Sequence, residues 1–208
     1  TSSWVTNADD VEVLRRTARV KGTHNRFSVN GLPVEAVFDK VHASVMLFDE
    51  RILTRADIPL IGDHNVSNVL AATLAVASAD RAFSTAPARE RIKAGVKSFH
   101  ALPNRLEVVA DVGGVTWVND SKATNVSSAR VAIEGMTQPV IVLLGGKHKG
   151  ESYAGLAPAI AKHAKAVIAY GEAAERVAAD LGGLLEGVPL ERLGSSFDEV
   201  ISRARALA

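Results

Sequence analysis

The chain has 208 residues, enough for one large domain or two small ones. Its 24 Lys and Arg residues nearly balance 23 Asp and Glu residues, and it has no basic run, so nucleic acid is excluded as the default partner. The absence of cysteine excludes disulfides, thiolate catalysis and Cys-based zinc sites, and it fits a cytoplasmic protein. No apolar run approaches the ~20 residues that cross a bilayer, so we expect no membrane insertion.

The N-terminus shows no basic segment followed by an apolar one, so it does not read as a signal peptide. The chain lacks an initiating methionine and starts close to Trp4-Val5, an apolar pair typical of a strand. We therefore expect this start to be a cut within a longer protein.

The first sixty residues alternate apolar and polar positions in short runs, as in Phe27–Val29, Val34–Phe38 and Val45–Phe48. Asn30-Gly31 and Asp49-Glu50 separate these runs, which predicts antiparallel hairpins.

Helical spacing follows. One helix is predicted after an N-cap at Asp63 or Asn65, and a second, opened by Pro87, over about Ala88 to Phe99. The first carries its apolar face at Val66, Val69, Leu70, Leu74 and Ala77. Leu102-Pro103-Asn104 then interrupts the pattern, and we place a domain boundary near Ala101, giving domains 1–101 and 102–208.

The second domain begins with two runs, Leu106–Val112 and Val115–Asn119, around the hairpin signal Gly113-Gly114. A helix is predicted over Val126–Glu134, capped by Asn125. Alternating strands and helices complete the pattern of a doubly wound α/β sheet. They are Val140–Leu144, Tyr153–His163, Ala166–Tyr170, Glu172–Leu181, Leu190–Leu193 and a helix from Phe197.

Two candidate sites are single polar features. Asn65 and Asn68 lie three residues apart at a helix start, where N–H groups and the helix dipole favour an anion, although helix capping alone also explains them. Arg105 follows a rigid interdomain connection and could grip a phosphate, although a lone arginine is usually a solvated surface residue.

Asn119–Asn125 (Asn-Asp-Ser-Lys-Ala-Thr-Asn) follows an apolar strand, where open α/β sheets bind ligands. If the extended run continues, Asp120 and Lys122 point to the same side, so that a carboxylate could hold ribose hydroxyls and an ammonium could offset phosphate charge. The alternative is a surface Asp–Lys pair leading into the next helix.

Gly145–Gly150 (Gly-Gly-Lys-His-Lys-Gly) follows the second apolar strand and suits a carboxylate or phosphate. It is not a phosphate-binding P-loop, because Glu151 stands where that motif needs its lysine. The histidines show no metal-ligand spacing, so no metal site is predicted.

In this order, Gly-x-His-Asn-x-x-Asn, Leu-Pro-x-Arg, Asn-Asp-Ser-Lys-Ala-Thr-Asn and Leu-Leu-Gly-Gly-x-x-Lys resemble the Mur ligase family. Asn7-Ala8-Asp9-Asp10 is similar to the family's central domain, and Asn119–Asn125 to the form used by members that add D-glutamate. The resemblance implies an α/β chain: the remainder of a central ATPase domain (1–101), then a Rossmann-like, doubly wound C-terminal domain (102–208).

The resemblance also implies the chemistry. ATP would phosphorylate the carboxylate of UDP-N-acetylmuramoyl-L-alanine, with Mg²⁺, and the amine of D-glutamate would attack the acyl phosphate. Carried over by motif, Lys122 would lie by the terminal phosphate or the reacting carboxylate. The nucleotide would contact Asn65, Asn68, Arg105 and Asp120, and the D-glutamate carboxylates would contact Thr124 and Lys149.

Departures from the family limit this expectation. The chain has no Gly-x-x-Gly-Lys-[Ser/Thr] loop and none of the family's magnesium-binding or carbamylated-lysine positions. We therefore expect the chain to be a portion of a cytoplasmic, monomeric protein and to have no ligase activity alone. Another Mur-type or folylpolyglutamate-type ligase and a non-catalytic nucleotide-binding module remain alternatives.

Overall fold

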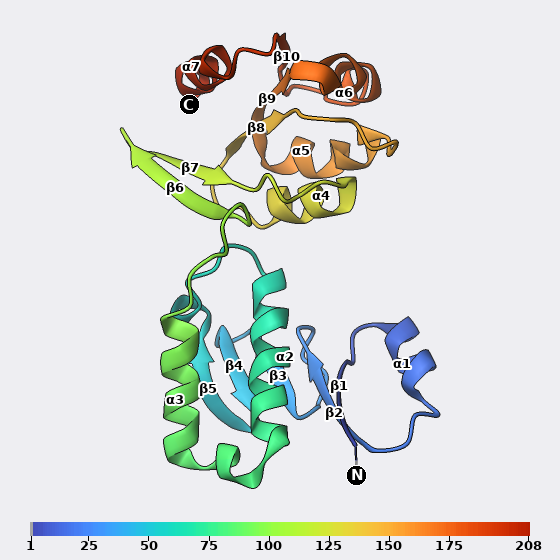
Figure 1. The fold of residues 1–208 in the computed structure, drawn as a ribbon, viewed down its shortest axis with the longest axis vertical. Helices are drawn as coiled ribbons and strands as arrows, with labels where there is room; N and C mark the ends of the chain where they lie inside the picture. The colour runs from blue at the N-terminus through green and yellow to red at the C-terminus, as the bar shows by residue number, and fades with distance from the viewer. Residues whose placement is uncertain (1) are drawn as a thin grey trace. The chain divides into compact units, whose positions relative to one another are not determined.

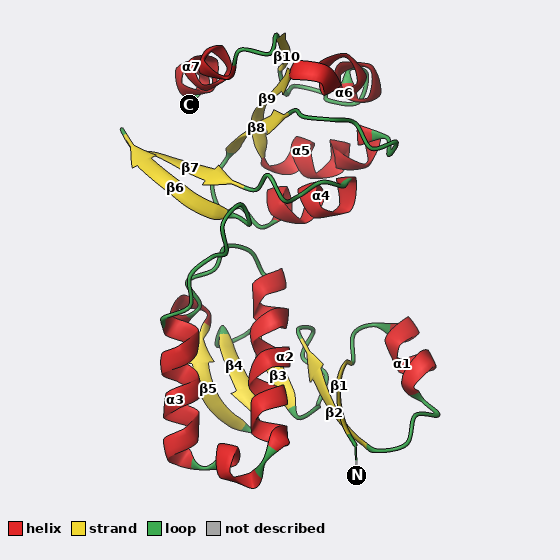
Figure 2. Cartoon of the chain, in the orientation of Figure 1, coloured by secondary structure: helices red, strands yellow, loops and turns green. Residues whose placement is uncertain are grey.

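The computed structural model describes residues 2–208, which divide into two compact units. The first unit ends at His100 and the second comprises Ala101–Ala208. Each unit has its own sheet and its own covering helices (Figures 1 and 2). No helix within residues 2–208 is long and apolar enough to cross a membrane.

The first unit contains a five-stranded sheet in the order β1-β2-β3-β4-β5. β1 pairs with β2, and β2 with β3, in parallel, whereas β3, β4 and β5 are antiparallel. A short helix, α1, connects β1 to β2 (Figure 1). The bounds are β1 Ser3–Asn7, α1 Val11–Thr17, β2 Thr23–Ser28, β3 Ala36–Asp39, β4 Ser44–Leu47 and β5 Glu50–Thr54.

The sequence prediction of hairpins in this unit is half correct. β4 and β5 form the expected antiparallel hairpin, and its two-residue turn is Phe48-Asp49, both with positive φ. The predicted hairpin at Asn30-Gly31 is wrong, because β2 and β3 run parallel. The Asp9 carboxylate accepts hydrogen bonds from the Ser28 hydroxyl (2.6 Å) and the Val29 N–H (2.7 Å), which tie the end of β2 to the segment after β1.

Two long helices cover the sheet of the first unit, α2 (His64–Ala79) and α3 (Ala86–Lys97) (Figure 1). Short 3₁₀ turns at Arg55–Asp57 and Arg81–Ser84 precede them. The predicted apolar face of α2 is confirmed: its buried residues are Val66, Val69, Leu70, Thr73, Leu74 and Ala77. Burying this stripe against the sheet forms the core of the unit.

The second unit is built on a parallel sheet in the order β10-β9-β8. Helices lie on both of its faces. Val167 and Ala169 of β9 pack in a cluster with residues of α4, α5 and α6, whereas Ile168 packs with Val200 and Ala204 of α7. The predicted doubly wound α/β architecture is therefore confirmed. The bounds are α4 Val126–Glu134, β8 Val140–Leu144, α5 Ala157–His163, β9 Ala164–Tyr170, α6 Ala174–Leu181, β10 Leu190–Leu193 and α7 Phe197–Leu207, with 3₁₀ turns at Tyr153–Leu156 and Gly171–Ala173.

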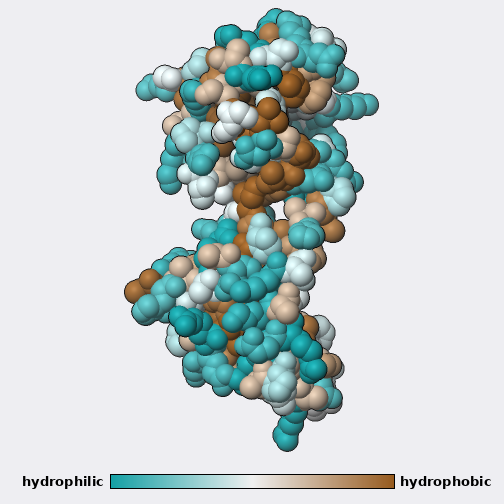
Figure 3. Space-filling view, turned by 90° about the vertical axis from the view of Figure 1, so that its left-hand side faces the viewer, coloured by the Kyte–Doolittle hydropathy of each residue, from teal (hydrophilic) through white to brown (hydrophobic). Residues whose placement is uncertain are grey.

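A two-stranded hairpin, β6 (Glu107–Val112) and β7 (Val115–Asn119), precedes this sheet. Gly113 and Gly114 both have positive φ (63° and 78°), as the predicted tight turn requires. The hairpin forms its own sheet, so β7 does not belong to the sheet that contains β8. Trp117 of β7 packs on the Ile168 cluster. Figure 3 shows apolar side chains gathered on one face of the second unit. Val108, Val109 and Val112 of β6 are exposed.

Candidate active site

Three loops of the second unit carry five of the seven predicted site residues. They are the turn Leu102–Leu106, which contains Arg105; the segment Asn119–Asn125, which contains Asp120, Lys122 and Thr124; and the loop Gly145–Ser152, which contains Lys149. Hydrogen bonds join the first loop to the second, and the third loop to the first residue of α4, which directly follows the second.

The turn around Arg105 is fastened to the segment that follows β7. The N–H of Leu106 donates to Asp120 Oδ1 at 3.1 Å, and the N–H of Lys122 donates to the carbonyl of Asn104 at 3.1 Å. The Asn119 amide adds a third bond, from its Nδ2 to Asn104 Oδ1, at 2.9 Å. Arg105, Asp120 and Lys122 are therefore brought together, although they come from segments about fifteen residues apart.

The segment after β7 is not extended, which corrects the sequence expectation. The N–H of Ala123 donates to the carbonyl of Asp120 (2.8 Å) and that of Thr124 to the carbonyl of Lys122 (2.9 Å), so the chain turns directly after the strand. These turns lead into α4, which Asn125 caps as predicted by accepting the Ser128 N–H at 2.7 Å.

The glycine-lysine loop after β8 meets this segment at the start of α4. The Glu151 carboxylate accepts the N–H of Val126, the first residue of α4, at 2.9 Å. A carboxylate is favoured there by the positive end of the helix dipole. Val126 is two residues from Thr124, and Glu151 is two residues from Lys149, both predicted substrate-binding residues. This bond therefore holds the chain at Thr124 close to the chain at Lys149.

The far end of the same loop is anchored to α6. The Ser152 hydroxyl (3.0 Å) and the Tyr153 N–H (2.9 Å) both donate to Asp180, and Arg176 forms an ion pair with the same carboxylate at 2.9 Å. Burial raises the pKa of Asp180, but these donors and the Arg176 charge outweigh it, so the pKa lies below its usual value. The loop carrying Lys149 is thereby tied to the fold by charged contacts.

The beginning of the loop is fixed by close packing. Gly145 lies against the ring of Tyr170 at the end of β9, and a Cβ at this position would overlap that ring. Gly146 and Gly150 have φ of 91° and 95°, values that L residues rarely adopt. The glycines shape the loop, and the lysines between them extend into solvent.

Asn65 and Asn68 lie in the first unit, at the start of α2. Asn68 Nδ2 donates to Asn65 Oδ1 at 3.1 Å, and Asn65 Nδ2 donates to the carbonyl of Ile61 at 2.8 Å. They share one helix face as predicted. The predicted capping is partly wrong, because α2 begins at His64 after Asp63, whose side chain makes no capping bond.

Three exposed cations of the candidate site suit an anionic ligand. They are Arg105, Lys122 and Lys149, and Thr124, which is also exposed, supplies a hydroxyl. Planar guanidinium and flexible ammonium groups suit phosphate and carboxylate oxygens. Across residues 2–208, no three His, Asp or Glu side chains gather into a group that could hold a metal ion.

Comparison with known proteins places these loops in a family. A model described as "Mur ligase, glutamate ligase domain" matches residues 104–208, which include all five predicted site residues of the second unit. The chain belongs to the Mur ligase family.

Relatives of this Mur ligase chain cover both of its units. The UDP-N-acetylmuramoylalanine–D-glutamate ligase of Acidobacterium capsulatum is 40% identical over 92% of the chain and 41% of its own length. The ligases of the same name from Bacillus cytotoxicus and Chromobacterium violaceum are 35% and 33% identical, over 97% and 98% of the chain. The chain spans about two fifths of the length of these relatives.

Solved structures agree on the fold of the Mur ligase chain. The UDP-N-acetylmuramate–alanine ligase of Thermotoga maritima superposes with a TM-score of 0.63 at 17% identity, covering 92% of this chain and 43% of that one. A UDP-N-acetylmuramoyl-L-alanyl-D-glutamate–2,6-diaminopimelate ligase gives a TM-score of 0.58 at 16% identity, covering 96% and 44%. At this identity the likeness extends to the fold alone.

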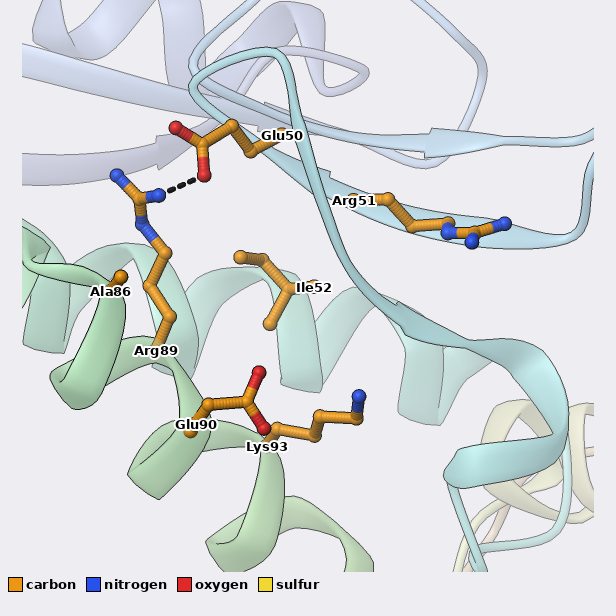
Figure 4. Close-up of a pocket in the computed structure, with 7 residues that line it drawn as sticks. All are labelled: Glu50, Arg51, Ile52, Ala86, Arg89, Glu90 and Lys93. Carbon is orange, nitrogen blue, oxygen red and sulfur yellow. Dashed lines mark hydrogen bonds and ion pairs between the residues drawn. The ribbon is translucent and has the colours of Figure 1, made fainter.

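A cavity in the first unit of the Mur ligase chain contains none of the predicted residues. It lies between β5 and α3 and has a volume of about 130 Å³, below the ~300 Å³ of ordinary ligand pockets. Figure 4 shows Arg89 reaching from α3 to form an ion pair with Glu50 on β5. We interpret this cavity as a charged contact between helix and sheet.

Sequence reasoning missed Asn104, Glu151 and Asp180, which hold the three loops of the Mur ligase site in place. Glu151 was considered only as the residue that rules out a P-loop. Its signal was its position beside the glycine-lysine loop, but its partner at Val126 lies 25 residues away. Asp180 gave no local signal, because it lies on α6, outside every motif.

Proposed function

We propose that this chain supplies nucleotide- and amino-acid-binding parts of a ligase that joins D-glutamate to UDP-N-acetylmuramoyl-L-alanine. The observation that carries the proposal is the joining of the Arg105 turn, the Asp120–Thr124 segment and the Lys149 loop by hydrogen bonds. Relatives named for this reaction share 32–40% of residues with the chain, which supports this choice over other Mur-type ligases.

In the proposed reaction, the carboxylate of UDP-N-acetylmuramoyl-L-alanine attacks the terminal phosphorus of ATP and ADP leaves. The amine of D-glutamate then attacks the acyl phosphate, and inorganic phosphate leaves as the amide forms. Catalysis of this kind depends mainly on positioning and charge neutralisation. The exposed cations of the second unit suit that task.

We assign the roles by chemistry. Arg105 binds phosphate or ribose oxygens of ATP, and Asp120 accepts hydrogen bonds from ribose hydroxyls. Lys122 neutralises charge on the terminal phosphate or the reacting carboxylate. Asn65 and Asn68 are also proposed as nucleotide-binding residues, Asn68 for the adenine.

Thr124 and Lys149 bind the carboxylates of D-glutamate. Their loops are held close together by the bond from Val126 N–H to Glu151, and a hydroxyl beside an ammonium is a suitable pair for a carboxylate.

Magnesium would supply neutralisation of phosphate charge in such a reaction. The described residues contain no carboxylate or histidine cluster that fits it, so no step is assigned to this chain through the metal. We propose that the protein acts in the cytoplasm as a monomer.

The test is ATP-dependent formation of the D-glutamate amide, measured as phosphate release that requires both substrates. We expect the 208-residue chain to be inactive alone and the complete protein in which this sequence occurs to be active with D-glutamate. Turnover by the short chain would contradict the first expectation. Equal turnover with L-alanine, diaminopimelate or folate substrates would contradict the second.

A non-catalytic nucleotide-binding module is the second candidate. It is favoured by one observation, since residues 1–208 contain no Gly-x-x-Gly-Lys-[Ser/Thr] sequence. ATP binding without amide formation by the complete protein would support it over the ligase.

A further inference from the structure

Asn104 occupies the variable position of the Leu-Pro-x-Arg motif, yet it makes more described contacts than its neighbours. Its N–H donates to Glu107 Oε2 at 2.8 Å, its carbonyl accepts the Lys122 N–H at 3.1 Å, and its side-chain oxygen accepts Asn119 Nδ2 at 2.9 Å. Its backbone and side chain therefore join the Arg105 turn to both ends of the Asn119–Lys122 segment.

The backbone on both sides of Arg105 is unusual. Asn104 has φ of 64° and Leu106 has φ of 46°, so two non-glycine residues in the left-handed region flank the arginine. Such conformations are disfavoured for L residues, and asparagine tolerates them better than most. They persist where surrounding contacts determine them, and they cluster at functional sites.

Burial and hydrogen bonding hold the backbone of this turn in place. Leu106 is 7% exposed, and its N–H is bonded to Asp120. Arg105 is exposed between two anchored neighbours. The backbone direction at Arg105 is thus set by Asn104 and Leu106, and the same bonds set the backbone at Asp120 and Lys122.

We propose that Asn104, with Asn119 as its partner, is a positioning residue that aligns Arg105, Asp120 and Lys122 for ATP. This inference rests on the proposed ligase function. Asn104 acts through the three residues that it connects. It has no contact with the Gly145–Ser152 loop among the described hydrogen bonds, so its removal affects ATP and leaves D-glutamate binding unchanged.

The test compares Asn104→Ala, Asn104→Gly and Asn119→Ala in the complete ligase in which this sequence occurs. Losing one hydrogen bond and a favourable left-handed residue should raise the KM for ATP about 5- to 10-fold in Asn104→Ala. Asn104→Gly should show a smaller rise, because glycine adopts the positive φ without strain. The KM for D-glutamate should change by less than about twofold in every variant.

If Asn104→Ala fails to fold, Asn119→Ala still tests the inference, because it removes the same hydrogen bond and keeps Asn104 in the Arg105 turn; it also removes the bond from the Ser121 N–H to Asn119 Oδ1 at 3.1 Å. It should also raise the KM for ATP. The double variant should be within about twofold of the more impaired single variant, because the Asn104–Asn119 bond is shared and can be lost only once. Independent, multiplied effects would overturn the pairing.

Asn25→Ala is the matched control, because it removes an amide hydrogen bond of the same length, 2.9 Å to Ser3 Oγ, in the first unit. It should leave the KM for ATP unchanged. An unchanged KM for ATP in Asn104→Ala, or an equal rise for D-glutamate, would overturn the inference.

Arg105→Ala and Asp120→Asn separate this inference from the proposed function. If these two variants impair ATP use and the Asn104 variants do not, only the positioning role fails. If these two variants also leave ATP use unchanged, the proposed nucleotide site itself fails.

Discussion

Replacing Glu151 by alanine tests whether the start of α4 holds the Lys149 loop in place. The substitution removes the acceptor of the Val126 N–H, a 2.9 Å bond to a charged group. Hydrogen bonds to charged groups contribute about 1.5–3 kcal/mol, and a favourable charge at a helix N-terminus adds about 0.3–1 kcal/mol. Because Glu151 is exposed, solvent screens this contact, and we expect a net loss of about 1 kcal/mol.

A loss of about 1 kcal/mol corresponds to roughly a fivefold change in an equilibrium constant. We expect the KM for D-glutamate to rise by about that factor in Glu151→Ala, because the loop must then be ordered by the ligand itself. The KM for ATP should stay within about twofold, since the Arg105 turn is held by separate bonds. Initial-rate kinetics of the complete ligase, with each substrate varied in turn, measure both constants.

Two further variants test whether the charge of Glu151, at this position, causes the change in D-glutamate affinity. Glu151→Gln keeps an oxygen acceptor without the charge and should lose about half as much D-glutamate affinity as alanine. Glu186→Ala removes another exposed carboxylate of the second unit, outside the site loops, and serves as the control. If Glu151→Ala binds D-glutamate normally while Lys149→Ala does not, the loop is ordered by something other than the α4 contact.

Three more substitutions test the proposed site and the stability of the first unit. Lys149→Ala should weaken D-glutamate binding about 10- to 100-fold and ATP binding far less, measured by calorimetry, because a carboxylate loses its cation. Asp120→Asn should raise the KM for ATP about tenfold in a rate assay, since a charged acceptor for hydroxyls is lost. The Lys97 hydrogen bond holds the pKa of Asp57 well below its usual value, so this carboxylate stabilises the fold above about pH 4 and loses that effect as pH falls. Asp57→Asn should therefore lower the urea midpoint more at pH 7 than at pH 3.

Elements set by neighbouring residues could be predicted from the sequence. The helix α4 has its predicted bounds, because Asn125 caps it and Gly135 follows it. The β6–β7 hairpin has its predicted turn, because Gly113-Gly114 adopts positive φ without strain. The parallel pairing of β2 with β3 could not be predicted, since it is not set by neighbouring residues; the end of β2, for example, is bonded to Asp9, 19 residues before Ser28.

Candidate site residues could be proposed from the sequence, but the contacts that hold their loops could not be predicted. Lys122 and Lys149 were found because cations follow apolar strands. Asn104 and Glu151 were not recognised as anchors, because a hydrogen bond between distant segments leaves no pattern in either one. The same reason explains why Asp120 and Lys122 were expected on one extended run and instead lie on a turn.

The two anchors imply that ATP and D-glutamate sites can be altered separately. Asn104 fixes the Arg105 turn to the segment after β7, and Glu151 fixes the Lys149 loop to the start of α4. The two sets of bonds share only the chain between Lys122 and Val126, which the Asn125 cap holds at its helical end. Substitutions at one anchor should therefore change one substrate constant, whereas a change that disrupts the Asn125 cap should change both. We therefore expect Asn125 to couple the ATP-binding and D-glutamate-binding parts of the proposed site.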